Sequence, residues 1–211
     1  MLFPMKATAA LMIWSLHFLV VQLPLTVERG EAAVNMPQED YSLYDLIIEG
    51  KFLTSQIQLV LLERMTVSRL VPNLDGSITM DFLQQQDYFN GMLPQELVRD
   101  FVGVNQIPAR LEARFQFEVR YRFVSEGTTE DSEAGIATPA LSDRARPVQA
   151  LSVLDRLAFS RVGRTLRNDQ ALVYVENRRR DGTGAGFLVW CRRQGQEWKL
   201  FDTEVVWTMR E

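Results

Sequence analysis

The clearest pattern in the chain is a strict alternation of apolar and polar residues over Arg114–Val124. One set of alternate positions is aromatic or aliphatic, and the other set is polar or charged. An alternation with period two is typical of a strand that has one buried and one solvated face. We therefore predict a strand over this segment.

The C-terminal region predicts more strands, separated by short turns. The turns are indicated at Asp181-Gly182 and at Gln194–Gln196, because Asp-Gly and Gly-containing segments favour tight hairpins. The strands are expected at Leu151–Val162, Ala171–Asn177, Gly186–Cys191 and Trp198–Trp207. Short turns between successive strands predict an antiparallel meander.

Helices are predicted mainly in the N-terminal half. Apolar residues recur at spacings of three and four over Pro37–Leu53 and Pro94–Val102, with proline at the first position of each segment. The segment Met80–Tyr88 is ambiguous between a short helix and a loop, and Gln56–Leu70 predicts a strand. Because the predicted helices come mainly in the N-terminal half and the strands mainly in the C-terminal half, we expect an α+β fold. In this fold the N-terminal helices pack on a curved, mainly antiparallel sheet that ends in a three- to four-stranded meander.

The N-terminus has the pattern of a secretory leader. Lys6 precedes the apolar run Ala7–Val21, and Gly30-Glu31-Ala32 fits a small-x-small cleavage site. We expect a signal peptide at residues 1–32 and a single domain at residues 33–211, secreted or periplasmic. An uncleaved signal-anchor over residues 7–25 is the alternative. Within the domain, residues 125–147 are polar, then rich in Ala and Pro, and predict a long surface loop.

Composition and charge narrow the function. The chain is 46% hydrophobic and 24% charged, which suits a folded domain, and its net charge of −4 argues against nucleic-acid binding. Its one histidine, His17, lies in the predicted leader. A mature chain without it has no Ser-His-Asp triad, Cys-His dyad or histidine zinc site. The one cysteine, Cys191, rules out an intramolecular disulfide and a cysteine zinc site, so we expect no metal and no cofactor.

Several residues are weak candidates for binding. An open sheet face that joins two arginines, or a basic hairpin tip, would attract an anionic surface or a small ligand, and strand aromatics can line a pocket. A solvated tip and core packing are the competing interpretations. The candidates are Arg120, Arg161, Tyr174, Arg178, Arg179 and Arg180.

No catalytic residue is assigned. Carboxylates near apolar residues could perform acid–base chemistry without histidine, and these are Glu49, Glu63, Asp155 and Glu204. The glycine-rich run Gly182–Gly186 leads into a strand rather than a helix, which favours a hairpin over a phosphate loop. Arg192 would lower the pKa of an exposed Cys191 thiol, but a lone cysteine in a strand is typical of an inert apolar residue.

The C-terminal segments SRVG at 160–163, QALVYV at 170–175, GAGFLVW at 184–190 and EWKL at 197–200 resemble the tail of a group of exported bacterial proteins with no assigned activity. The resemblance implies export and no catalytic residues. The order of a helix followed by a curved sheet is more loosely similar to cystatin-like and NTF2-like folds, which host both enzymes and binding modules.

Three functions remain open from the sequence. The leading hypothesis is an exported, non-enzymatic binding or structural domain. The second is a small-ligand pocket protein or a carboxylate-dependent enzyme, which two facing carboxylates in one pocket would favour. The third is an envelope-associated protein held by an uncleaved leader.

Overall fold

The computed structural model of the chain describes residues 36–71, 78–125, 128–135, 153–179 and 181–210, with only the backbone given for 128–135 and Asp155. The chain divides into two units, Met1–Ala32 and Ala33–Glu211, and all described residues belong to the second. The predicted leader and Arg180 lie outside the described residues. No helix in the described ranges is long and apolar enough to cross a membrane.

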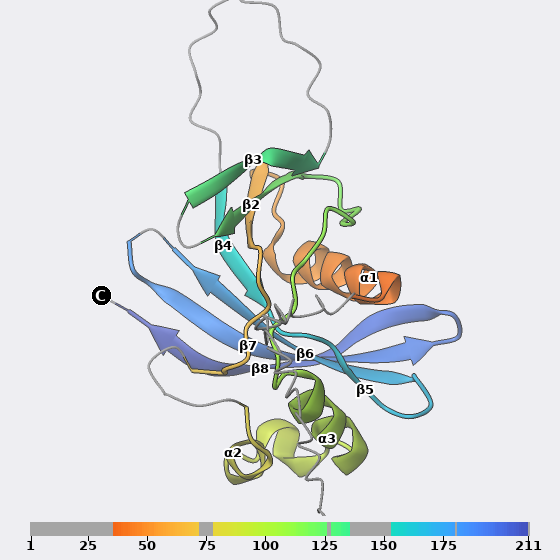
Figure 1. Cartoon of the computed structure of the whole chain (residues 1–211). Coiled ribbons are helices and arrows are strands. Elements are labelled where there is room, and N and C mark those ends of the chain that lie inside the picture. Colours follow the sequence, from red (N-terminus) through yellow and green to blue (C-terminus); the bar gives the residue numbers. More distant parts are fainter. Residues whose placement is uncertain (1–35, 72–77, 126–127, 136–152, 180, 211) are drawn as a thin grey trace, which may run out of the picture. The chain divides into compact units, whose positions relative to one another are not determined.

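The centre of the fold is an eight-stranded mixed sheet (Figure 1). The strand order is β3-β2-β1-β4-β6-β7-β8, and β5 pairs with β6 outside this path. Strand β1 is parallel to both neighbours, and every other pair is antiparallel. The strands are β1 (Leu59–Glu63), β2 (Arg120–Ser125), β3 (Thr128–Gly135), β4 (Val153–Phe159), β5 (Gly163–Arg164), β6 (Gln170–Arg178), β7 (Gly184–Gln194) and β8 (Glu197–Met209).

Three α-helices lie in the described residues: α1 (Gln38–Ile47), α2 (Met80–Gln85) and α3 (Gln95–Val104). A π-helical turn, Ile48–Phe52, continues α1, and a 3-10 turn, Tyr88–Gly91, follows α2. Pro37 and Pro94 precede α1 and α3, where a missing N–H costs nothing. Thr79 caps α2 by accepting a hydrogen bond from the Phe82 amide at 3.2 Å. The structure confirms an α+β fold with a C-terminal strand meander.

The core is divided between the two faces of β6 and β7. On one face, Val173 and Val175 pack in the cluster that contains Tyr44 of α1. On the other face, Leu172 and Trp190 pack in the cluster of α2 and α3. Figure 1 shows α1 on one side of these strands, with α2 and α3 on the other. Because both faces are covered, the residues of β6 that point to either face are apolar along most of the strand.

Two predicted strands are shorter in the structure than in the sequence pattern. Of Gln56–Leu70, only Leu59–Glu63 forms a strand of the sheet. The residues that follow leave this pairing, because the Thr66 amide donates to the Ala109 carbonyl and the Val67 amide to the Phe159 carbonyl at the end of β4. Of Arg114–Val124, only the part from Arg120 is a strand. The four aromatic residues of the apolar set are buried and its valine, Val119, is partly buried. The burial of Phe115 and Phe117 comes from aromatic packing without strand pairing.

The expected long loop at 125–147 also contains a strand. Thr128–Gly135 forms β3, which pairs antiparallel with β2. Its polar composition did not indicate a strand, because edge strands tolerate charged residues on both faces. Residues 136–152 lie outside the description.

The glycine-rich run has a packing role at the β7–β8 pair. A Cβ on Gly186 would lie 2.5 Å from the Tyr174 hydroxyl and also clash with Trp207, and a Cβ on Gly184 would lie 2.7 Å from the Asn177 carbonyl oxygen. The absence of side chains lets the Trp207 indole cross β7 and donate to the Tyr174 hydroxyl at 2.6 Å. This run therefore serves the strand packing that the sequence favoured over a phosphate loop.

Helix α1 is fixed to the meander by a charged cluster. Arg164 donates to the buried carboxylate of Asp40 at 2.6 Å. Glu39 accepts from Asn168 at 3.2 Å and from Arg193 at 2.8 Å. Arg164 also lies over the Trp198 ring, 5.5 Å from its centroid. The cluster thus joins the first turn of α1 to residues of β5, β7 and β8.

Candidate functional site

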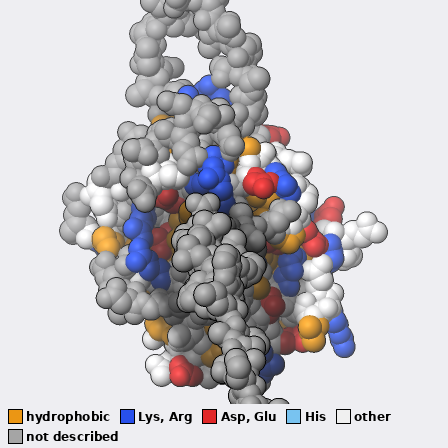
Figure 2. Space-filling model, viewed as in Figure 1, with side chains coloured by type: hydrophobic (Ala, Val, Ile, Leu, Met, Phe, Trp, Pro, Cys, Tyr) orange, Lys and Arg blue, Asp and Glu red, His pale blue; other side chains and the backbone are white. Residues whose placement is uncertain are grey.

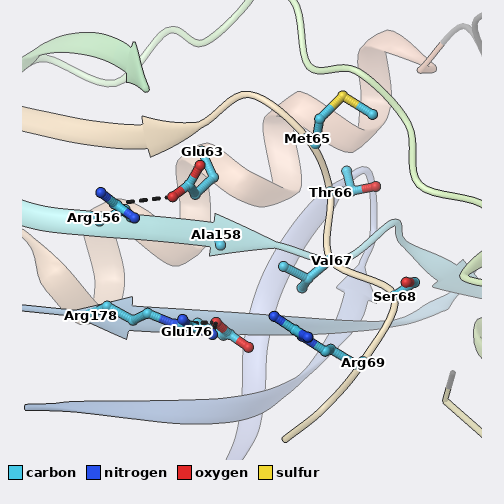
Figure 3. A pocket seen from close by; sticks show the side chains of 10 residues that line it. All are labelled: Glu63, Met65, Thr66, Val67, Ser68, Arg69, Arg156, Ala158, Glu176 and Arg178. Atoms are coloured by element: carbon cyan, nitrogen blue, oxygen red, sulfur yellow. Dashed lines mark hydrogen bonds and ion pairs between the residues drawn. The ribbon is translucent and has the colours of Figure 1, made fainter. Parts of the chain in front are cut away.

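A pocket of about 340 Å³ opens on the sheet where β1, β4 and β6 run side by side (Figure 3). Five of the side chains that line it are ionisable, which is unusual for a cavity beside a core. The lining consists of Glu63, Met65, Thr66, Val67, Ser68, Arg69, Arg156, Ala158, Glu176 and Arg178. The charges therefore meet in one place although they come from three separate segments of the chain.

The alternation of each strand places these charges on one face. In β6, Leu172 and Tyr174 point to the face covered by α3, and Glu176 and Arg178 follow on the same face beyond that cover. The register pairs Ala158 of β4 with Glu176. Arg156, two residues earlier in β4, lies on the same face as Ala158.

Glu176 is the most deeply placed charge, with a side chain only 1% exposed. Its Oε2 accepts from Nε and Nη2 of Arg178 at 2.8 and 2.7 Å. Its Oε1 lies 3.0 Å from the Tyr174 hydroxyl, which is also 2.6 Å from the Leu70 carbonyl oxygen. Both carboxylate oxygens are therefore occupied. Burial, and next the charge of Glu176, raise the pKa of Tyr174, so this hydroxyl stays protonated and can donate.

Glu63 and Arg156 form the second ion pair of the pocket. Arg156 Nε lies 3.1 Å from Glu63 Oε1, and the side chains are 37% and 22% exposed, respectively. Burial raises the pKa of Glu63, with Arg156 and then Arg178 opposing it and Glu176 adding to it. This carboxylate is the more accessible of the two.

The remaining wall is the segment Met65–Arg69, which leaves the sheet after β1. It is fixed by backbone hydrogen bonds from Thr66 to Ala109 and from Val67 to Phe159, at 2.9 and 2.8 Å. From its end, the exposed side chain of Arg69 extends toward Glu176 (Figure 3). Among the described residues, Arg69 makes no hydrogen bond or ion pair. The wall therefore brings a third guanidinium to the pocket.

The pocket carries a formal excess of positive charge, because three arginines face two glutamates. Guanidinium groups present planar forks of donors that match carboxylate and phosphate oxygens. No group of three or more His, Cys, Asp or Glu side chains within the described ranges is arranged to hold a metal ion. The arrangement suits recognition of a polar ligand by hydrogen bonds and charge.

Of the sequence candidates, Arg178 lines this pocket, whereas Tyr174 is fully buried in the core behind Glu176. Tyr174 and Arg178 both contact Glu176, one as a hydrogen-bond donor and the other as an ion-pair partner. Arg179 is exposed at the turn that follows β6, where its amide donates to Thr183. Glu63, one of the candidate carboxylates, lines the pocket as well.

The other two arginine candidates lie elsewhere. Arg120 is exposed on β2, while Arg161 donates to the Val104 carbonyl at 2.7 Å and lies beside Asn105 at the end of α3. No described hydrogen bond or ion pair joins the two. In Figure 2, basic and acidic side chains are interspersed over the visible face, without one continuous basic surface.

Sequence reasoning missed Glu176, Arg156 and Arg69. A signal existed for Glu176, because it is an ionisable residue that directly adjoins the apolar run Ala171–Val175 of its strand. Arg156 gives the same signal in β4, which reads VLDRLAF. Arg69 has no such signal, since its place follows from the path of the loop.

Two other groups have chemistry that the sequence left open. Burial raises the pKa of the Cys191 thiol to about 12, so this residue is an inert part of the core rather than a nucleophile. On the α1 side, a hollow of about 480 Å³ is lined in part by Asp45, whose Oδ2 accepts from the Gln116 amide at 3.0 Å. The buried Oδ1 of Asp45 has no hydrogen-bond partner among the described residues.

Comparisons with protein-family models, with curated proteins and with solved structures found no match.

Proposed function

We propose that this chain is a non-catalytic binding domain that takes a small polar ligand in the pocket between β1, β4 and β6. The observation that carries the proposal is Glu176, a carboxylate with a 1% exposed side chain at the base of a pocket with four other charged side chains. The pocket is the kind of feature that favours a small-ligand protein over a purely structural domain.

The energetics of Glu176 support a role beyond stability. A buried ion pair gains little over apolar residues of the same volume, because desolvation offsets the Coulomb attraction. The preceding residues on the same face of β6, Leu172 and Tyr174, show that this face accepts large, mostly apolar side chains. The charged pair Glu176–Arg178 is thus explained better by recognition of a ligand than by packing of the core.

A carboxylate-dependent enzyme is the second candidate, because Glu63 and Glu176 share the pocket. Acid–base or glycosidase chemistry needs two carboxylates that both reach the reacting bond. Glu176 has each oxygen engaged by another side chain, whereas Glu63 keeps Oε2 for other contacts. This difference supports binding over catalysis.

The proposal is tested by screening the full chain by NMR with anionic, neutral and cationic small molecules. We expect binders to shift resonances of the pocket residues, and Arg156→Gln to weaken them while the exposed control Arg120→Gln has no effect. The binding function would be wrong if no compound shifts the pocket. Turnover of a bound compound that is abolished by Glu63→Gln would favour the enzyme instead.

Export of the chain is a separate proposal that rests on Lys6, Ala7–Val21 and Gly30-Glu31-Ala32. The resemblance to exported proteins supports the same conclusion. Sequencing the N-terminus of the protein from cells should find a mature chain that starts near Ala33. An intact N-terminus in the membrane fraction would favour the envelope-associated alternative.

A further inference from the structure

The three arginines of the pocket differ in how far they are engaged. Arg178 places two nitrogens on Glu176 Oε2, at 2.8 and 2.7 Å. A carboxylate that water cannot reach needs this neutralisation, because an unpaired buried charge is strongly destabilising. Arg178 is therefore held by Glu176 and belongs to the fixed base of the site.

Arg156 and Arg69 retain free donors. Arg156 engages Glu63 through Nε alone, at 3.1 Å, and no described residue accepts from its two terminal nitrogens. Arg69 has no partner in the described part of the chain. Both side chains line the same pocket from opposite walls, one on β4 and one on the segment after β1.

We infer that the ligand carries a carboxylate or phosphate group, which binds between Arg69 and Arg156. This inference rests on the proposed binding function. The free guanidinium donors match the acceptor oxygens of such a group, and charge-assisted hydrogen bonds of this kind are the strong ones. One added negative charge also balances the formal excess of the pocket.

A cationic ligand fits the same contacts poorly. Glu63 is the one accessible carboxylate, and it is already paired with Arg156. A bound cation would have to share this carboxylate with Arg156 and would lie among three guanidinium groups that repel it. An anion instead adds bonds to donors that are free and leaves the Glu176–Arg178 pair intact.

Glu63 acts in this site as a competitor for Arg156. A ligand oxyanion and the Glu63 carboxylate seek the same guanidinium, and they also repel each other. Neutralising Glu63 without changing its shape should therefore strengthen anion binding. This direction is opposite to the loss that a simple structural role of Glu63 would produce.

The test titrates the full chain with inorganic phosphate and with acetate at constant ionic strength, followed by NMR of pocket resonances. We expect Arg69→Gln and Arg156→Gln each to raise Kd about five- to tenfold, and Glu63→Gln to lower it about fivefold. The control Arg120→Gln should leave Kd unchanged. Heteronuclear spectra of each variant show that the fold is retained.

The outcomes separate this inference from the proposed function. Shifts caused by neutral or ammonium-bearing compounds, but not by phosphate or acetate, would overturn the anionic ligand and leave the binding domain standing. An unchanged Kd in Arg69→Gln and Arg156→Gln would do the same. No shift with any compound would remove both. Binding to phosphatidylglycerol vesicles without binding of the soluble anions would replace the small ligand by a membrane surface.

Discussion

At the scale of single residues, the fold holds a carboxylate that solvent hardly reaches. Glu176 is balanced by Arg178, whose own side chain is 39% exposed. Losing either member of the pair should therefore not cost the same stability. Removing the arginine leaves a buried carboxylate without a partner, whereas removing the glutamate leaves a guanidinium that water can reach.

Arg178→Gln should lower the free energy of unfolding by about 2 kcal/mol, less than for a fully buried pair because the arginine is partly solvated. The double variant Arg178→Gln/Glu176→Gln should recover part of this loss, because it has no unpaired buried carboxylate. Urea unfolding of the four proteins in this cycle measures the effect, with Arg179→Gln as the exposed neighbour control. If the Arg178→Gln protein is as stable as the wild type, Glu176 does not depend on Arg178 for its stability in the fold.

Gly186 makes a second prediction at this scale. A methyl group there meets the Tyr174 hydroxyl and the Trp207 indole, so Gly186→Ala should cost about 1–3 kcal/mol through overpacking. Gly103 offers a matched control, because no atom lies within 4 Å of an added Cβ and the residue is in α3. Gly103→Ala should be neutral or stabilising by about 0.5 kcal/mol. Thermal unfolding distinguishes the two substitutions, and equal effects would disprove the packing role of Gly186.

At the scale of elements, α1 is attached to the sheet by charge as well as by its apolar face. Arg164 makes the main charged contacts of this attachment. It forms an ion pair with Asp40, and its Nη1 also lies 3.8 Å from Glu39 Oε2. Burial raises the pKa of Asp40, and the hydrogen bond from Arg164 opposes this rise. The carboxylate therefore depends on its arginine to stay ionised in the fold.

Arg164→Ala should destabilise the protein by about 2–3 kcal/mol at neutral pH, because Asp40 then lacks its partner. The loss should shrink under acidic conditions, where a protonated Asp40 no longer needs a cation. Hydrogen exchange should show α1 losing protection before the meander. Arg167→Ala, at an exposed arginine in the turn after β5, is the control and should change stability by less than about 0.5 kcal/mol. A similar loss in both variants would exclude the role of the cluster.

At the scale of the whole molecule, Asp45 makes stability depend on pH. Burial raises its pKa from 3.8 to about 6, with the hydrogen bond from the Gln116 amide opposing the rise. The folded state therefore holds this proton more tightly than the unfolded state. The free energy of unfolding therefore falls as the pH rises from about 3.8 to about 6. Above about pH 6 the ionised Asp45 destabilises the folded state by its full amount.

Asp45→Asn should remove this cost. Relative to the wild type, the variant should gain about 1 kcal/mol at pH 7.5 and little or nothing at pH 4, because the amide stays neutral throughout. Urea unfolding across this range gives the difference, with the exposed Glu118→Gln as control. A difference between wild type and variant that does not change with pH would refute the assignment to Asp45.

The whole fold could be predicted from the sequence more fully than its site. The hairpins of the meander are local, so the Asp181-Gly182 turn and the strands on either side were visible in the pattern. The parallel pairing of β1 with β2 and β4 was not visible, because no turn links these strands and their register depends on distant partners. The pocket depends on that pairing. Arg178 and Glu63 could be named individually, but only the tertiary fold shows that they line the same pocket.

The position of β1 between β2 and β4 has a consequence for the order in which the protein matures during synthesis. A ribosome makes Glu63 early, yet its neighbours in the finished sheet, Val124 of β2 and the end of β4, are made much later. The pocket is completed only when Arg178 has emerged. The nascent chain thus lacks the complete pocket for most of translation, and a messenger truncated before codon 178 yields a chain without the Glu176–Arg178 pair.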